Sequence, residues 1–298
     1  MAFTIPTMPL AGSGAIAPDP YAVLHNMHYR RTQRGVHQGV FHAHRITITG
    51  SSWHLILTLL LLSFVFGCAS TDHAADSSAP QQASSVPRPT SEYQRLDIRG
   101  WSVLVNPDLD VDLRLKDETL ELLDDHLYRI TRKIPPVALE HLRTIEIWVE
   151  LDMPKTRCMC YHVSKDWLIP NGYNPDKEGS VEVGNARAFL EWTQVQPWMV
   201  LHELAHGYHD QVFGYDDPGI MAAWQAKVDE GGYREVLHIT GSLREHYGLT
   251  NQMEYFAETT EAYFGTNDFH PFVRGELLKV DPAGARLMED TWFLDGPG

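Results

Sequence analysis

The chain is organised around the stretch Pro197-Trp198-Met199-Val200-Leu201-His202-Glu203-Leu204-Ala205-His206-Gly207-Tyr208-His209-Asp210. It contains the pattern His-Glu-x-x-His, with His202 and His206 four residues apart. On a helix this spacing places both imidazoles on one face, one turn apart, where they can bind the same metal ion. Zinc accepts imidazole nitrogens, and Glu203 is placed to take a proton from a water on the metal. The pattern therefore predicts a zinc site on a helix, with a third ligand elsewhere in the chain.

The residues around this pattern favour a buried helix. Trp198 to Leu201 are apolar, and Glu203 is the only charged residue between positions 192 and 209. Pro197 suits the first position of a helix, and Gly214 suits its end. The alternative is a packed or solvated helix that carries two histidines and no metal.

Length and composition allow one or two domains with a substantial core, since the chain has 298 residues of which 43% are hydrophobic. The formal net charge of −15 is unevenly distributed. Residues 1–68 contain four Arg and one Asp, which leaves 20 bases and 38 acids, a net charge of −18, in the rest of the chain. Such an acidic surface argues against nucleic acid as a partner.

The first 68 residues have the features of an export signal. An apolar run from Leu55 to Gly67 stops at Cys68 and is too short to span a bilayer, which needs ~20 residues, but fits the core of a signal peptide. Val65-Phe66-Gly67-Cys68 resembles a bacterial lipobox, in which the cysteine is lipidated. We therefore expect an exported protein anchored through Cys68 to a membrane of the bacterial cell envelope; a short buried helix over 55–67 is the alternative. Residues 69–91, rich in Ala, Ser, Gln and Pro, read as a disordered linker before a domain over 92–298.

The first half of this domain predicts an α+β fold with a small mixed sheet. Alternation and β-branched residues predict strands at 101–105, 144–150, 158–163 and 180–183. Leucines at helical spacing predict a helix from Leu113 to about Ile134, where Pro135 and Pro136 end it.

The second half predicts two further helices around a strand or hairpin arm at 233–239. The first runs from Asp217 to about Val228, and the second from about Thr250 to Gly265. Glu254, Glu258 and Glu261 stand at positions i, i+4 and i+7 of the second helix. Carboxylates stacked in this way repel one another, and a cation would relieve the repulsion.

Two cysteines precede the central motif. Cys158, Cys160 and His162 would share one face of an extended segment, which allows a second metal site, although buried thiols are the simpler interpretation. A disulfide between residues two apart on a strand is disfavoured, because their side chains lie ~6.5–7 Å apart.

Several positions can be tested as the third metal ligand. The pattern His-Glu-x-x-His-x-x-Gly-x-x-His is absent, because His209 and Val212 replace the required Gly and His. Glu230, in a thermolysin-like arrangement, and His209 both remain as alternatives.

The segment Thr250-Asn251-x-x-Glu254-Tyr255-Phe256-Ala257-Glu258 is similar to the zinc-ligand helix of the anthrax lethal factor-like metallopeptidases. The resemblance covers about 196–265 and implies a zincin-like domain of the gluzincin type, with one Zn²⁺ held by His202, His206 and Glu254. It implies that Tyr247 is the catalytic electrophile, and it matches Asp210 to an Asp on the metal helix of that family. The implied activity is hydrolysis of a peptide or protein substrate.

This resemblance implies a mechanism that uses a zinc-activated water. Glu203 would be the general base, Tyr247 would stabilise the oxyanion, and Glu258 would accept a hydrogen bond from a ligand histidine. By analogy with other zincins, residues 181–188 would form the edge strand that binds an extended peptide. Two other functions stay open: a non-catalytic envelope lipoprotein that uses the fold for binding, and a zinc amidase or other non-peptide hydrolase.

Overall fold

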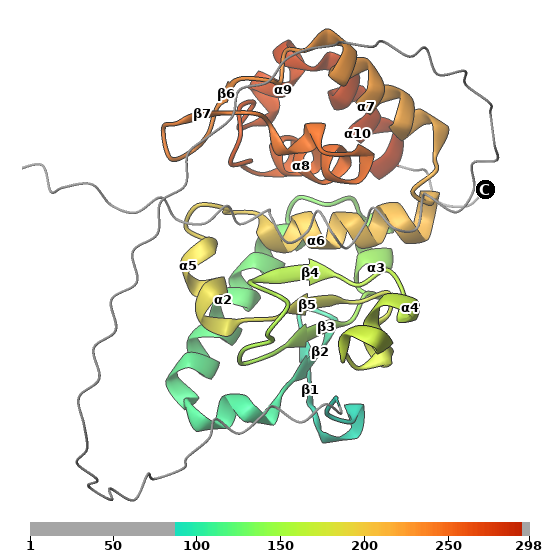
Figure 1. Cartoon of the computed structure of the whole chain (residues 1–298). Helices are drawn as coiled ribbons and strands as arrows, with labels where there is room; N and C mark the ends of the chain where they lie inside the picture. The colour runs from blue at the N-terminus through green and yellow to red at the C-terminus, as the bar shows by residue number, and fades with distance from the viewer. Residues whose placement is uncertain (1–86, 294–298) are drawn as a thin grey trace, which may run out of the picture. The chain divides into compact units, whose positions relative to one another are not determined.

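A mixed five-stranded sheet is the first layer of the part of the chain that the computed structural model describes, residues 87–293 (Figure 1). Its strand order is β1-β2-β3-β5-β4. The three central strands β2, β3 and β5 are parallel, and the outer strands β1 and β4 are antiparallel to their neighbours. The strands are β1 (Gln94–Ile98), β2 (Trp101–Val105), β3 (Ile147–Val149), β4 (Met159–Tyr161) and β5 (Val181–Val183). The structure thus confirms an α+β class with a small mixed sheet.

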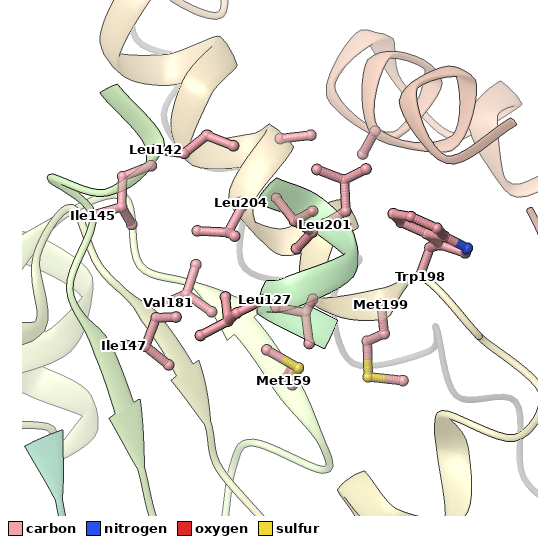
Figure 2. Close-up of a cluster of buried hydrophobic side chains, with 14 of the residues drawn as sticks. Leu127, Leu142, Ile145, Ile147, Met159, Val181, Trp198, Met199, Leu201 and Leu204 are labelled. Carbon is pink, nitrogen blue, oxygen red and sulfur yellow. The ribbon is translucent and has the colours of Figure 1, made fainter. Parts of the chain in front are cut away.

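One face of this sheet packs against helices and forms the main core. The helices of this layer are α2 (Leu113–Thr131), α3 (Pro136–Leu142), α5 (Ala186–Trp192) and α6 (Met199–Tyr208), and the short helix η4 (Pro107–Val111) leads into α2. Figure 2 shows Leu201 and Leu204 of α6 beside Leu127 of α2 and beside Ile147 and Val181 of the sheet. The predicted helix over 113–134 is confirmed as α2. Pro136 does more than follow this helix: it is the first residue of α3, a position at which proline is favoured.

The opposite face of the sheet is covered by short segments. They are η3 (Thr90–Glu92), α4 (Lys165–Leu168), η5 (Ile169–Asn171) and η6 (Pro175–Lys177). Tyr93 stacks edge-on against Trp148, and Asn174 donates a hydrogen bond to the Arg88 carbonyl. The folded part therefore begins a few residues before the predicted boundary at Glu92.

A second, mainly helical layer follows α6 in the chain. In space, α6 lies between this layer and the sheet (Figure 1). It contains the π-helical turn η7 (His209–Phe213), α7 (Pro218–Glu230), β6 (Val236–Leu237), β7 (Leu243–Arg244), η8 (Tyr247–Leu249), α8 (Gln252–Phe264), α9 (Arg274–Val280) and α10 (Pro282–Trp292). The predicted helices at 217–228 and 250–265 and the hairpin arm at 233–239 are confirmed. Asn251 fixes the start of α8, because its side chain accepts hydrogen bonds from the Met253 and Glu254 N–H groups at 2.9 Å.

Two expectations about local structure are wrong. Residues 181–188 do not form an edge strand: β5 is paired on both sides, its continuation turns into α5, and the edge belongs to β4. The central helix begins at Met199, with Trp198 as its N-cap, so Pro197 precedes the helix.

The apolar run over 55–67, Cys68 and residues 69–86 lie outside the described residues. Among the helices over 87–293, none combines the length and the apolar character needed to cross a bilayer.

Candidate metal centre

Three buried side chains from two helices converge on one point. His202 and His206 come from one face of α6, and Glu254 comes from the first turn of α8. Glu254 Oε2 lies 3.1 Å from His202 Nε2 and 3.2 Å from His206 Nε2. A tetrahedral ion with bonds of ~2.0–2.1 Å separates its ligand atoms by about 3.3 Å. The two nitrogens and the carboxylate oxygen lie within 4.8 Å of one another, so these buried groups could hold a metal ion.

Close packing at a glycine brings α6 against the sheet. A Cβ atom on Gly207 would lie 2.7 Å from Ile145 Cδ1, closer than real Cβ atoms approach, and 3.0 Å from Tyr161 Cε2, which is tighter than most such contacts. The absence of a side chain at Gly207 therefore lets the backbone of α6 approach the edge strand β4 directly after His206.

A second glycine holds α8 near the start of α6. At Gly265, which ends α8, a Cβ atom would meet the Trp198 ring at 2.2 Å. Trp198 is the N-cap residue of α6, so this contact joins the end of one helix to the beginning of the other. Together with the Asn251 cap, it places Glu254 opposite the two histidines.

The electrostatics of the three residues are those of opposite charges held close together. Burial alone would raise the pKa of Glu254, but the His206 and His202 imidazoles more than offset it and lower the pKa far below its usual range. Burial would likewise lower the pKa of His202, yet the hydrogen bonds to Glu254 and Glu261 raise it well above its usual value. The site thus favours a carboxylate at Glu254 together with positive charge beside it, which a metal ion would also provide.

Glu203 lies next to this point and has the properties of a general base. It is 3% exposed, and its Oε2 atom has no hydrogen-bond partner within residues 87–293. Burial raises the pKa of Glu203, while the two histidines and a hydrogen bond from the Tyr161 N–H group act in the opposite direction. A buried carboxylate oxygen with no protein partner is what a carboxylate needs in order to accept a proton from a water at the metal. The residues present therefore fit a metal.

The carboxylate closest to the far side of His202 is Glu261 and not Glu258. His202 Nδ1 lies 2.7 Å from Glu261 Oε1 and 3.8 Å from Glu258 Oε1. Burial raises the pKa of Glu261 to about 7, although the His202 imidazole beside it acts to lower that value. The expectation had placed Glu258 in this contact; the i+7 residue of the same helix takes it instead.

Tyr247 lies in an aromatic cluster, whereas Asp210 lies at the end of α6 and is hydrogen-bonded to the sheet. Tyr247 is buried in η8, which packs against α8, and its ring belongs to a cluster with Tyr233, Val236, Tyr255 and Phe269. Asp210 lies in the π-helical turn after α6 and accepts a hydrogen bond of 2.9 Å from the Tyr161 hydroxyl. Asp210 thus links the end of α6 to the edge strand.

Two tyrosines for which the sequence predicts no role also lie at the site. Tyr161 of β4 contributes its N–H group to Glu203, and Tyr215 donates its hydroxyl to the His206 carbonyl at 3.3 Å. Burial, with Asp210, Tyr161, Glu254 and Glu203 nearby, raises the pKa of Tyr215 well above its usual value. No short motif marks either tyrosine.

The two alternative third ligands do not reach the site. Glu230 is exposed at the end of α7 and pairs with Lys227 Nζ at 2.9 Å. His209 is buried between Tyr215 and Phe256, and burial lowers its pKa to about 3. Neither belongs to a group of ligand atoms close enough to share an ion, among the residues that the structure describes.

The cysteine segment divides between the two faces of the sheet. Cys160, His162 and Glu182 meet on the face away from α6, where His162 Nε2 lies 2.6 Å from Glu182 Oε2. Cys158 precedes β4 and packs against Met199 on the other side, with 3.3 Å between the sulfur atoms, and both thiols are free. Lys177 also pairs with Glu182, so we interpret this cluster as a buried ion-pair network.

Comparison with known proteins gives no match to a family model, to a curated protein or to a solved structure. The interpretation of the metal centre therefore depends on its geometry and on its set of donor atoms.

Proposed function

We propose that this protein is a zinc-dependent metallopeptidase of the lethal factor-like type with a zincin-like fold. The observation that supports it most is the convergence of His202, His206 and Glu254 beside the buried carboxylate of Glu203. Two imidazoles and one carboxylate are a catalytic zinc ligand set, which leaves a fourth position for water or substrate. The distances of 3.1 and 3.2 Å between the ligand atoms agree with tetrahedral coordination.

The chain's own residues divide the chemistry between them. A bound zinc ion would supply an acidified water and polarise the scissile carbonyl. Glu203 accepts the proton of the attacking water on its free Oε2 atom and returns it to the leaving amine. Its raised pKa suits this exchange, because a base that must also act as an acid works best with a pKa closer to neutrality.

The substrate is a peptide that lies along β4 as an additional strand. β4 bonds to its neighbour β5 through Cys158 and His162: the Gly184 N–H donates to the Cys158 carbonyl at 2.7 Å, and the His162 N–H donates to the Ser180 carbonyl at 2.9 Å. Groups of Met159 and Tyr161 then point to the other edge, in keeping with the hydrogen bond from Tyr161 N–H to Glu203. An extended peptide at this edge would bring its backbone next to the general base.

Tyr247 is assigned the stabilisation of the oxyanion. The assignment comes from its position seven residues before Glu254, as in the family that the sequence resembles. The packing of its ring in an aromatic cluster supports a fixed hydroxyl, and a fixed donor costs no reorganisation during the reaction.

The protein is proposed to act at the bacterial cell envelope, anchored through a lipid on Cys68. Support comes from the apolar run that ends at this cysteine and from the polar linker that follows it. Expression with radiolabelled palmitate tests the anchor: label should enter the wild-type protein and be lost in Cys68→Ser. Equal labelling of both would refute the anchor without affecting the peptidase proposal.

A digest of a peptide library by zinc-loaded wild type, beside Glu203→Gln, tests the activity. We expect cleavage by the wild type only, while both proteins hold zinc equally. Cleavage at equal rates would refute the role of Glu203. Zinc binding without any peptide cleavage would favour a binding protein, and cleavage of amide model compounds alone would favour an amidase.

A further inference from the structure

The imidazole of His202 is held at both of its nitrogens by carboxylates of the same helix. Glu254, in the first turn of α8, lies 3.1 Å from Nε2, and Glu261 lies 2.7 Å from Nδ1. The two glutamates are seven residues apart, about two turns, so they stand on one face of α8 and ~10.5 Å apart along its axis. An imidazole from α6 fits between them.

We infer that Glu261 is the positioning residue of the metal centre, which fixes the tautomer and the orientation of His202. When a metal ion takes Nε2, one imidazole proton is left on Nδ1, where the Glu261 carboxylate accepts it across the 2.7 Å contact. The lone pair of Nε2 is then directed at the point shared with His206 and Glu254. This role rests on the metal-dependent function proposed above.

Glu258 is the competing candidate, and it is placed less well for this role. Its carboxylate lies 3.8 Å from His202 Nδ1 and 3.8 Å from His246 Nδ1, both outside hydrogen-bond range. His246 already accepts a hydrogen bond from the Gly248 N–H at its Nδ1 atom. Glu258 therefore stands between two imidazoles and hydrogen-bonds to neither.

The two glutamates form a matched pair for an experiment. Both belong to α8, both are at most 1% exposed, and they are one turn apart. Glutamine keeps the size of each side chain and removes its charge. A difference between Glu261→Gln and Glu258→Gln then reports on the contact with His202 and not on burial or on the helix.

The affinity for zinc of the purified full chain, measured by competition with a chromophoric chelator, is the first readout. Replacing an outer partner of a ligand histidine weakens metal binding by roughly 10–100-fold. We expect a loss of this size in Glu261→Gln and a loss below about threefold in Glu258→Gln. The position of the imidazole proton, from nitrogen-15 NMR of histidine-labelled protein, is the second readout. The Nδ1–H signal of His202 should be protected in wild type and Glu258→Gln and should change in Glu261→Gln.

Each other outcome overturns the inference in a distinguishable way. Equal losses of zinc affinity in the two variants, or a larger loss in Glu258→Gln, would overturn the role of Glu261. The proposed function would still stand in that case if the wild type binds zinc and cleaves peptides. No zinc binding by the wild type would overturn both. A His202 without a proton on Nδ1 in the zinc-loaded wild type would overturn the tautomer assignment alone.

Discussion

Replacing the buried Lys177 with methionine should destabilise the fold strongly. Lys177 is 1% exposed, and its Nζ atom lies 2.6 Å from Glu150 Oε1 and also pairs with Glu182. Both carboxylates are at most 1% exposed, and the three charges meet on the face of the sheet away from α6. In Lys177→Met the carboxylates would stay buried, with His162 as their remaining basic neighbour. Removing one partner of a buried ion pair costs about 3–5 kcal/mol, because the other charge is left uncompensated.

Urea unfolding followed by tryptophan fluorescence, with thermal unfolding beside it, measures this cost. For a domain of this size, 3–5 kcal/mol corresponds to a Tm lower by about 6–20 °C. Adding Glu150→Gln to Lys177→Met removes one of the stranded charges and should recover part of the loss. Lys165→Met is the matched control, since Lys165 is exposed and lies 3.1 Å from Glu178, and surface pairs contribute about 0–1 kcal/mol. A Lys177→Met protein as stable as the control would refute the interpretation of this cluster as an ion-pair network.

Three further predictions concern packing, pH and catalysis. Gly207→Ala places a Cβ atom 2.7 Å from a side chain packed against α6 and should cost about 1–3 kcal/mol of stability; an unchanged Tm in a thermal melt would contradict it. Burial lowers the pKa of His126, His209 and His246 from 6.5 to about 3, so the unfolded chain binds protons first and stability falls as the pH drops below 6.5. At pH 5 each of these histidines should lower the free energy of unfolding by roughly 2 kcal/mol. In urea titrations of the metal-free protein, His126→Gln should make the stability depend less steeply on pH. A variant whose stability changes with pH as steeply as that of the wild type would argue against a buried neutral His126. Tyr247→Phe should lower kcat about 10²–10³-fold with zinc affinity unchanged, and a kcat equal to the wild type would remove Tyr247 from the mechanism.

The helices could be predicted from the sequence because their signals are local. The central helix is marked by apolar flanks, and α8 by the Asn251 cap at one end and Gly265 at the other. The spacing of His202 and His206 determines that they share a face, whatever the rest of the fold does. His202 and His206 could for this reason be named before any tertiary structure was known, whereas Glu254 was named from the resemblance of its helix to that of the lethal factor-like metallopeptidases.

The order of the strands could not be predicted in the same way. β4 and β5 are three residues each, and their pairing depends on segments far apart in the chain. The analogy with other zincins assigns residues 181–188 to the edge strand, but β5 pairs on both sides and its continuation becomes a helix. The sequence also does not determine whether Glu258 or Glu261 contacts His202, because this depends on the rotation of α8 about its axis relative to α6. Both residues lie near the same face of an isolated helix.

The measurement that tests the metal centre most directly is the zinc content of the purified chain, for the wild type beside Glu254→Ala. The geometry of His202, His206 and Glu254 predicts one zinc ion per chain in the wild type and at least tenfold weaker retention in the variant. One zinc ion held equally well by both proteins would contradict Glu254 as the third ligand. No zinc in the wild type after loading at neutral pH would contradict the metal centre itself.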